Sequence, residues 1–209
     1  IRVLSNGVDL DLFRPVNRAE ARGRIGAGEG LLLLSVGNLV PLKGHDITIR
    51  ALAILKHAAL MIAGSGPEEA RLKDLAHDLG VAERVRFLGS VPQKELPAYY
   101  AAADLLVLSS SREGMANVLL ESLGCGTPVV ASDIPGMGEV VGPPESGMLM
   151  KDRTPEALAE AVQTLLADPP ARDDTRAYAE KFSWDATTAG QVDLFREILT
   201  RDQPRTSRS

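Results

Sequence analysis

Six short runs of apolar residues constrain the fold of this chain more than any other feature. Most of the runs end in Gly or Ser. They lie at residues 31–37, 59–64, 84–89, 104–110, 127–132 and 146–150. Strands that are apolar on both faces are typical of a parallel sheet covered by helices, which the amphipathic segments between the runs supply. The sequence therefore predicts an α/β fold, a Rossmann-like doubly wound parallel sheet of about six strands with helices on both faces.

Helices are predicted between these runs. They lie at about residues 44–56, 67–79, 94–102, 116–124 and 155–167. The last of them follows Thr154, a favourable N-cap, and starts at Pro155, a residue common at the first helical position. Beyond Pro169 the pattern is helical and charged, and the ending "RDQPRTSRS" has the composition of a disordered tail.

The final helix is expected to carry an apolar stripe. Its members are Phe182, Trp184, Val192, Phe195 and Leu199. A stripe without cover forms an exposed apolar patch. We therefore expect either self-association through this helix or a poorly ordered terminus beyond about Arg201.

Composition and charge exclude several classes of protein. The chain has 209 residues, of which 44% are hydrophobic and 24% charged, as is usual for a globular protein of one large or two small domains. A formal net charge of −5 argues against a nucleic-acid partner, because phosphate binding needs clustered Lys and Arg. The single Cys125 suits a reducing cytosol, the apolar runs are too short to span a bilayer, and no signal peptide is visible. Because the chain begins at Ile1 without Met, we expect a fragment of a cytoplasmic protein.

Four loops with unusual residues follow the first four predicted strands. They read "VGNLVPLKG", "AGSGPE", "LGSVP" and "SSSREGMAN". Parallel strands end at the same edge of a sheet, and open sheets of this kind bind ligands in the crevice at that edge. The sequence therefore predicts that these loops meet around a ligand.

Glu113 and Glu121 lie in an otherwise apolar, glycine-rich segment. Burial of an unpaired charge costs several kcal/mol, so each carboxylate needs a partner or a ligand. The helix that begins near Ala116 offers free amides and a dipole that favour a diphosphate. Glu121 is then placed to accept from the two hydroxyls of a ribose, and Glu113 to face the group attached to the diphosphate. In the structural alternative, Glu113 caps the helix and Glu121 belongs to a buried salt bridge.

Lys43 follows the first strand and is placed to reach a phosphate, although a surface lysine is the usual fate of a single Lys. Asp46 is interpreted as a helix-start acid, and His45 as a solvated or capping residue rather than a catalyst. The turn at residues 64–67 is of a kind that is common without any ligand.

No cluster of His, Cys or carboxylate residues has metal-ligand spacing in the sequence, and no Asp-x-Asp pair is present, so metal-free chemistry is expected. Cys125, between two glycines at a helix end, is interpreted as a small core residue rather than a nucleophile.

Taken in order, these motifs resemble the carboxyl-terminal half of retaining GT-B glycosyltransferases of family four. The resemblance covers about 180 of the 209 residues, from "SNGVDLDLFRP" through "VGNLVPLKGHD" and "IAGSGPE" to "SGMLM". Its most specific element is the pair Glu113 and Glu121, with seven residues between them, followed by the strand "GTPVV". The predicted sheet is then one half of a GT-B fold.

In the family this half binds the nucleotide-sugar donor, and an amino-terminal Rossmann-like domain binds the acceptor. The resemblance implies a linker with a remnant of that missing domain at residues 1–14, the donor-binding domain at 15–182, and a crossover helix with a flexible tail at 183–209. Ile1 to Leu4 are then expected to add nothing to the main sheet.

The resemblance also implies roles for single residues. Glu113 faces the sugar and Lys43 the diphosphate, and these two are the expected catalytic residues. The amides around Asn117 and Val118 hold the diphosphate, and Glu121 holds the ribose. Val91 lies near the base through its backbone. Further donor-binding positions are Gly37, Asn38, Gly64, Gly114, Met115 and Ala116.

Two positions depart from the family pattern. Asn38 stands where the family usually has Arg, which removes one of two phosphate-neutralising cations; Lys43 alone, Arg112 or the missing domain is left to compensate. Met115 and Ala116 replace the common Phe-Gly, which we interpret as a subfamily difference.

The function that the resemblance implies is donor binding in a metal-independent, retaining bacterial hexosyltransferase of polysaccharide or glycoconjugate synthesis. The donor is a UDP- or GDP-sugar, and no cofactor is expected. The fragment alone is expected to be inactive, and the whole protein cytoplasmic or attached to the inner membrane face through the missing domain. Two alternatives stay open: a nucleotide-sugar epimerase on a related fold, and a non-catalytic nucleotide-binding module.

Overall fold

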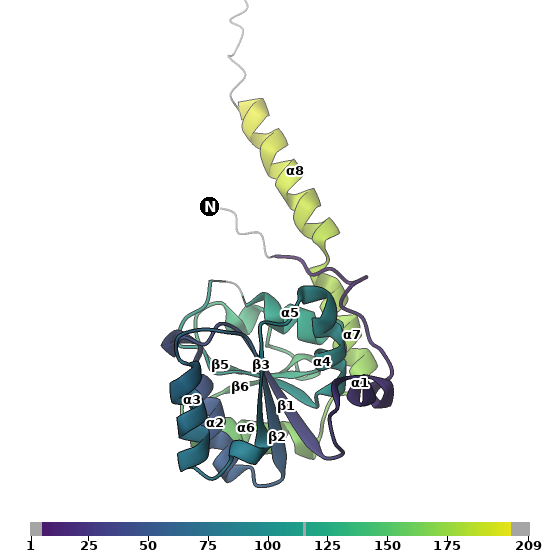
Figure 1. Ribbon diagram of the computed structural model, residues 1–209. Coiled ribbons are helices and arrows are strands. Elements are labelled where there is room, and N and C mark those ends of the chain that lie inside the picture. Colours follow the sequence, from purple (N-terminus) through teal and green to yellow (C-terminus); the bar gives the residue numbers. More distant parts are fainter. Residues whose placement is uncertain (1–5, 115, 202–209) are drawn as a thin grey trace, which may run out of the picture.

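A single parallel sheet of six strands organises the chain (Figure 1). The computed structural model describes residues 6–114 and 116–201. The strands are β1 (Leu31–Val36), β2 (Ala58–Ala63), β3 (Val85–Gly89), β4 (Leu105–Leu108), β5 (Val129–Ser132) and β6 (Gly147–Met150). Their order across the sheet is β3-β2-β1-β4-β5-β6, and all neighbours are parallel. The predicted doubly wound α/β fold is confirmed.

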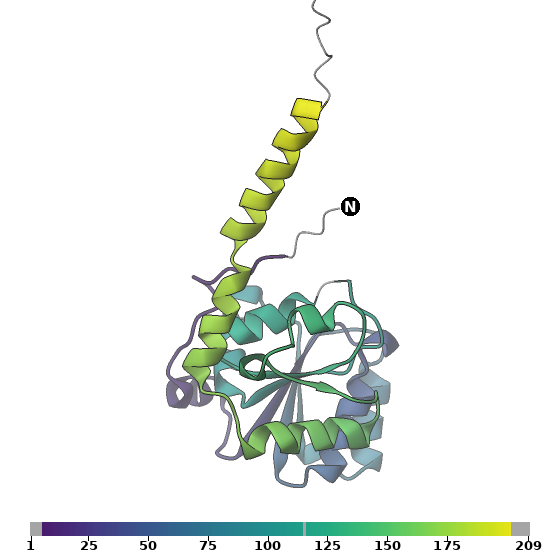
Figure 2. The same ribbon diagram turned by 180° about the vertical axis from the view of Figure 1, so that it is seen from behind.

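Helices form a layer on each face of this sheet (Figures 1 and 2). The first layer consists of α2 (His45–Ile54), α3 (Glu69–Asp78) and α6 (Pro155–Ala167). The second consists of α1 (Arg18–Ile25), α4 (Leu96–Ala102), α5 (Asn117–Gly124) and α7 (Arg172–Ala179). Short 3-10 helices lie at Pro41–Lys43, Ala82–Arg84, Gln93–Glu95, Met137–Glu139, Pro144–Ser146 and Glu180–Phe182.

The two layers explain why the strands are apolar throughout. In β1, Leu33 packs into the core beneath α2, while Leu32 and Leu34 pack into the core beneath α4 and α5. Every residue of β4 and β5 is buried, as expected for central strands covered on both faces.

The predicted helices are present, with shifted ends. Only the last matches at both ends: Thr154 Oγ1 accepts from the Ala157 amide at 3.1 Å and caps α6. Helix α1 was not predicted. Its caps were visible in the sequence, but only Ala21 and Ile25 of this helix are buried, so the apolar stripe is too short to recognise.

The start of the described chain packs on the domain. Phe13 is buried against Tyr100, and Arg176 of α7 donates to the Phe13 carbonyl at 2.6 Å. Val8 is also buried, and its amide donates to the Phe182 carbonyl at 2.8 Å. Residues expected as an interdomain linker thus contribute to this core. Ile1 to Leu4 lie outside the described residues.

The final helix, α8 (Trp184–Arg201), projects away from the sheet domain in both views (Figures 1 and 2). The predicted stripe is exposed along it, with Phe195 63% and Leu199 70% exposed, and Ile198 adds to it. Phe182 was wrongly assigned to this helix: it lies in the preceding 3-10 helix and packs edge-on against Tyr178 at 5.4 Å between ring centroids. Self-association stays a prediction, and the tail beyond Arg201 lies outside the described residues.

No helix among residues 6–114 and 116–201 has both the length and the apolar character needed to cross a membrane.

Candidate active site

Three of the predicted loops meet at the carboxyl edge of the sheet. Gly37, Gly64 and Val91 line one pocket of about 170 Å³, together with Asn38, Ser90 and Leu96. The Gly64 amide donates to the Gly89 carbonyl at 2.8 Å, and a Cβ at Gly64 would lie 1.9 Å from the Gly37 carbonyl oxygen. With φ +150°, Gly64 therefore allows a contact between two loops that a side chain would block.

Lys43 and Glu113 form an ion pair across this edge. The Lys43 Nζ lies 2.7 and 2.9 Å from the two carboxylate oxygens of Glu113, and Ser110 Oγ donates to Glu113 at 2.6 Å. The Glu113 side chain is 8% exposed and that of Lys43 23%. A carboxylate at this depth needs an ammonium to offset its lost hydration.

This pair bears on two interpretations of Glu113. The carboxylate, which we expected to face the sugar, also has a cation as a partner, and its contact with a sugar stays a prediction. The alternative, in which Glu113 caps the following helix, is wrong, since no side chain of the described residues caps α5.

Gly44 fixes the distance between the loops that carry this pair. Its φ is +67°, and a Cβ there would lie 2.1 Å from the Ser109 carbonyl oxygen. Thr48 of α2 and Ser109 are joined by a buried hydrogen bond of 3.1 Å between their hydroxyls. The N-terminus of α2 is therefore packed directly against the end of β4.

His45 was predicted to be a solvated or capping residue. In the structure it is buried, with only 3% of its surface exposed. Its Nδ1 lies 3.1 Å from Ser35 Oγ and its Nε2 lies 3.3 Å from the Asn38 carbonyl oxygen. Burial lowers the pKa of this imidazole, so the neutral form is favoured. Because a carbonyl only accepts, Nε2 carries the proton. His45 thus connects α2 to the loop that carries Asn38.

Glu121 has surroundings of a different kind. Its Oε2 accepts from the Tyr100 hydroxyl at 2.8 Å. Burial raises the pKa of the Glu121 carboxyl, while hydrogen bonds from Tyr100 and Gln93 oppose the rise. No described cation forms an ion pair with Glu121, so the salt-bridge alternative is wrong. Tyr100 and Gln93 were not predicted.

The N-terminus of α5 borders a second pocket. Gly114 and Ala116 line it, next to Asn6 and Phe182, and its volume is about 180 Å³. Asn117 is the first residue of the helix, and its Oδ1 accepts from the Asn6 side chain at 3.0 Å. Val118 is half-buried, and Met115 lies outside the described residues.

Two further predictions concern Cys125 and metals. Cys125 is buried in the core as predicted, and burial raises the pKa of its thiol to about 12, which leaves it unreactive. Within the described ranges, no three His, Cys, Asp or Glu side chains come together as metal ligands would.

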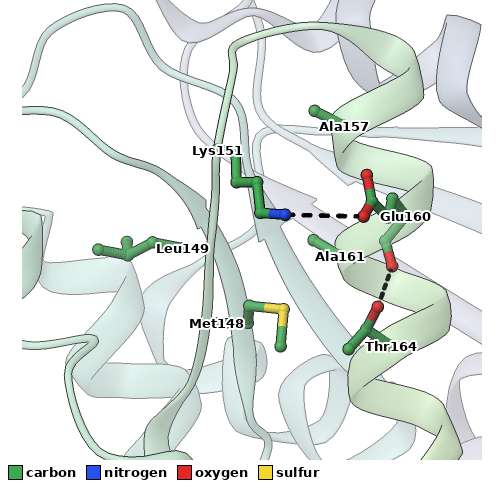
Figure 3. A pocket seen from close by; sticks show the side chains of 7 residues that line it. All are labelled: Met148, Leu149, Lys151, Ala157, Glu160, Ala161 and Thr164. Atoms are coloured by element: carbon green, nitrogen blue, oxygen red, sulfur yellow. Dashed lines mark hydrogen bonds and ion pairs between the residues drawn. The ribbon is translucent and has the colours of Figure 1, made fainter.

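A third pocket lies between the edge strand β6 and α6 (Figure 3). There Lys151 points toward Glu160, with 4.0 Å between Nζ and Oε1. Both side chains are mostly exposed, and the pocket contains none of the predicted site residues.

Comparison with known proteins shows the family of the chain. The family described as "Glycosyl transferases group 1" matches residues 17–182. A D-inositol 3-phosphate glycosyltransferase of Acidothermus cellulolyticus is 38% identical over 95% of this chain and 48% of that protein. A protein with the same description from Frankia alni is 37% identical over 96% of this chain and 54% of that protein. The chain thus spans about half the length of the curated relatives it matches.

Solved structures agree in fold. Sucrose-phosphate synthase from Thermosynechococcus elongatus is similar at a TM-score of 0.88 and 30% identity, over 96% of this chain and 53% of that one. Anabaena Alr3699/HepE in complex with UDP-glucose is similar at a TM-score of 0.85 and 25% identity, over 94% of this chain and 57% of that one. These likenesses confirm the resemblance to the carboxyl-terminal half of GT-B glycosyltransferases. The chain belongs to the group 1 glycosyl transferases.

Proposed function

We propose that this chain binds the nucleotide-sugar donor of a glycosyltransferase that acts with retention and without a metal. One observation carries the proposal: the Lys43–Glu113 ion pair, the pocket at Gly37 and Gly64, and the α5 N-terminus share the carboxyl edge of the sheet. This is where open parallel sheets bind nucleotides. The rival epimerase and binding-module functions have no observation that favours them.

In the proposed complex, the diphosphate lies at the N-terminus of α5. The backbone amides near Asn117 and Val118 and the helix dipole favour an anion there. The Lys43 ammonium adds a point charge within reach of the same loop. Glu121 accepts from the ribose hydroxyls, and the base occupies the pocket beside Val91.

The proposed chemistry is the transfer of a hexosyl group. The bond between the anomeric carbon and the β-phosphate oxygen breaks, and its electron pair stays on the diphosphate. Lys43 and the helix amides stabilise the added negative charge. Glu113 orients the sugar and stabilises the positive charge at the anomeric carbon. The acceptor hydroxyl attacks from the face that the diphosphate leaves, and its proton goes to a base outside these residues.

Asn38 leaves Lys43 without a second cation at the family's usual position. Arg153, which sequence reasoning did not select, lies nearby: its Nε donates to the Ser109 carbonyl at 2.7 Å, and its Nη2 is 2.8 Å from where a Gly44 Cβ would be. We propose that Arg153 adds positive potential to the edge that holds the diphosphate. We expect the full-length protein to lose sugar transfer with Arg153→Ala and to keep it with Arg112→Ala.

The proposed donor is a UDP-sugar. Anabaena Alr3699/HepE, 25% identical, was solved with UDP and with UDP-glucose, which favours uridine over guanosine. Titration calorimetry of the 209-residue chain with UDP, GDP and ADP tests this. UDP is expected to bind tightest, and no binding of any of the three at millimolar concentration would reject the proposal. We further propose a cytoplasmic location and a part in bacterial glycoconjugate synthesis.

A further inference from the structure

Tyr100 is a buried side chain whose hydroxyl contacts Glu121. Its hydroxyl donates to Glu121 Oε2 at 2.8 Å, and the residue is fully buried. The ring packs edge-on against Phe13, with 6.0 Å between centroids. The Tyr100 carbonyl accepts from Thr127 Oγ1 at 2.7 Å. Contacts at both ends therefore hold the ring in one place.

The hydroxyl is a permanent donor. Burial, and then the charge of Glu121, raises the pKa of Tyr100 well above its ordinary value, so the phenol keeps its proton at every physiological pH. A carboxylate offers about four acceptor sites. The Tyr100 hydroxyl occupies one of them, and the others serve the Gln93 side chain and the hydroxyls of a diol.

Few other groups bear on Glu121. Cys125, which follows α5, is the titratable neighbour, and its thiol stays protonated because burial raises its pKa to about 12. Arg172 and Arg176 of α7 lower the pKa of Cys125 slightly, against the effect of burial. The carboxylate therefore faces a phenol, an amide and a thiol rather than a cation.

We infer that Tyr100 is a positioning residue for the nucleotide: its hydroxyl holds the Glu121 carboxylate in the orientation that receives the ribose diol. This inference rests on the proposed function. Tyr100 itself touches no ligand, because it lies beneath Glu121 in the core.

Removal of the Tyr100 hydroxyl has an effect on Glu121 that removal of a purely structural hydroxyl would lack. A donor to the ionised carboxylate stabilises that form against burial. Loss of the Tyr100 hydroxyl therefore raises the pKa of Glu121 further. Ribose binding needs the ionised carboxylate, so nucleotide affinity must begin to fall at a higher pH than in the wild type.

The experiment is UDP titration of the 209-residue chain between pH 4 and 8, with Tyr100→Phe, Tyr99→Phe and Glu121→Ala. Tyr99→Phe is the matched control, because it removes a hydroxyl about 100° around the same helix. Titration of the UDP phosphates is common to all variants and cancels in the comparison. Tyr100→Phe is expected to weaken binding about threefold to tenfold at pH 7 and to move the acid midpoint to higher pH. Tyr99→Phe is expected to do neither.

The outcomes separate the inference from the proposed function. If Glu121→Ala weakens binding while Tyr100→Phe leaves affinity and midpoint unchanged, the inference is wrong and the function stands. The inference is also wrong if Tyr100→Phe weakens UDP binding but leaves the acid midpoint of binding unshifted. Full affinity in Glu121→Ala would overturn both.

A second measurement covers the case in which Tyr100→Phe does not fold. The chain has three tyrosines, and Tyr99→Phe/Tyr178→Phe leaves Tyr100 alone. Biosynthetic 3-fluorotyrosine in that background makes the remaining hydroxyl a stronger donor without a change of shape. The acid midpoint of UDP binding is then expected to move to lower pH, and an unmoved midpoint contradicts the inference.

Discussion

Glu113 and Glu121 lie in one short segment with seven residues between them, yet their surroundings are opposite. Glu113, in the loop before α5, has an ammonium on both oxygens and a serine hydroxyl on one. Glu121, inside the helix, has a phenol and an amide. The first carboxylate is neutralised within the protein, while the second keeps its charge for hydrogen-bond donors. The two carboxylates of one motif are therefore expected to differ in how their removal affects protein stability and nucleotide binding.

Removal of the Lys43 ammonium is expected to have the largest effect on stability. Lys43→Ala leaves Glu113 buried without a cation, and breaking a buried pair from one side costs about 3 kcal/mol. Urea denaturation measures the loss. Lys151→Ala is the control, because its pair with Glu160 is exposed and contributes less than about 0.5 kcal/mol. Equal effects of the two variants would show that Glu113 is not effectively buried.

Nucleotide affinity is expected to separate the two glutamates. Glu121→Ala removes charge-assisted hydrogen bonds to the ribose, worth roughly 1.5 to 3 kcal/mol, and lowers UDP affinity about tenfold to hundredfold. Glu113→Ala is expected to leave affinity unchanged or raise it, because the freed Lys43 ammonium turns to the phosphates. Calorimetry with UDP on both variants decides, and equal losses would remove the distinction between the two carboxylates.

Much of this arrangement could be predicted from sequence, because the apolar runs gave the strands and parallel strands end at one edge. That the loops of Gly37, Gly64 and Val91 lie at one edge follows from the parallel strands. That they share a pocket also depends on the strand order β3-β2-β1, which was not predicted. The Lys43–Glu113 pair was missed although both residues were selected for that edge. The sequence did contain a signal for this pair, because Lys43 and Glu113 have opposite charges and both were predicted at the same edge of the sheet.

Tyr100 and His45 could not be predicted in the same way. In "AYYAAAD" an aromatic residue in a core looks the same whether or not its hydroxyl meets a carboxylate. That contact depends on how α4 packs against α5, which local sequence does not specify. The burial of His45 likewise depends on the close approach of α2 to β4, which is set by Gly44.

A smaller effect is expected at the serine that supports Glu113. Ser110 is buried, and Ser110→Ala removes a hydrogen bond to a charged group, which contributes about 1.5 kcal/mol. Ser111→Ala is the control, because its exposed hydroxyl donates to the Leu42 carbonyl at 3.3 Å and contributes less than about 0.5 kcal/mol. If Ser110→Ala lowers the free energy of unfolding no more than the control does, Lys43 alone is enough to stabilise the buried Glu113 carboxylate.

The smallest effect is a gain in stability at Glu121. Burial raises the pKa of this carboxyl, so its favourable contribution to folding is complete below the unfolded pKa of about 4.3 and is lost as pH rises through the folded pKa. At pH 7 the ionised side chain therefore destabilises the fold. Glu121→Gln removes that charge, and its amide oxygen still accepts from Tyr100.

The variant is expected to melt at a higher temperature than the wild type at pH 7 and at the same temperature near pH 4. Glu29→Gln, which removes an exposed carboxylate, is expected to change neither. Thermal denaturation at several pH values measures the difference. Because Glu121→Gln also weakens UDP binding, a more stable but weaker-binding protein would show that Glu121 is retained for its ligand. A destabilised variant at pH 7 would instead assign Glu121 to the fold.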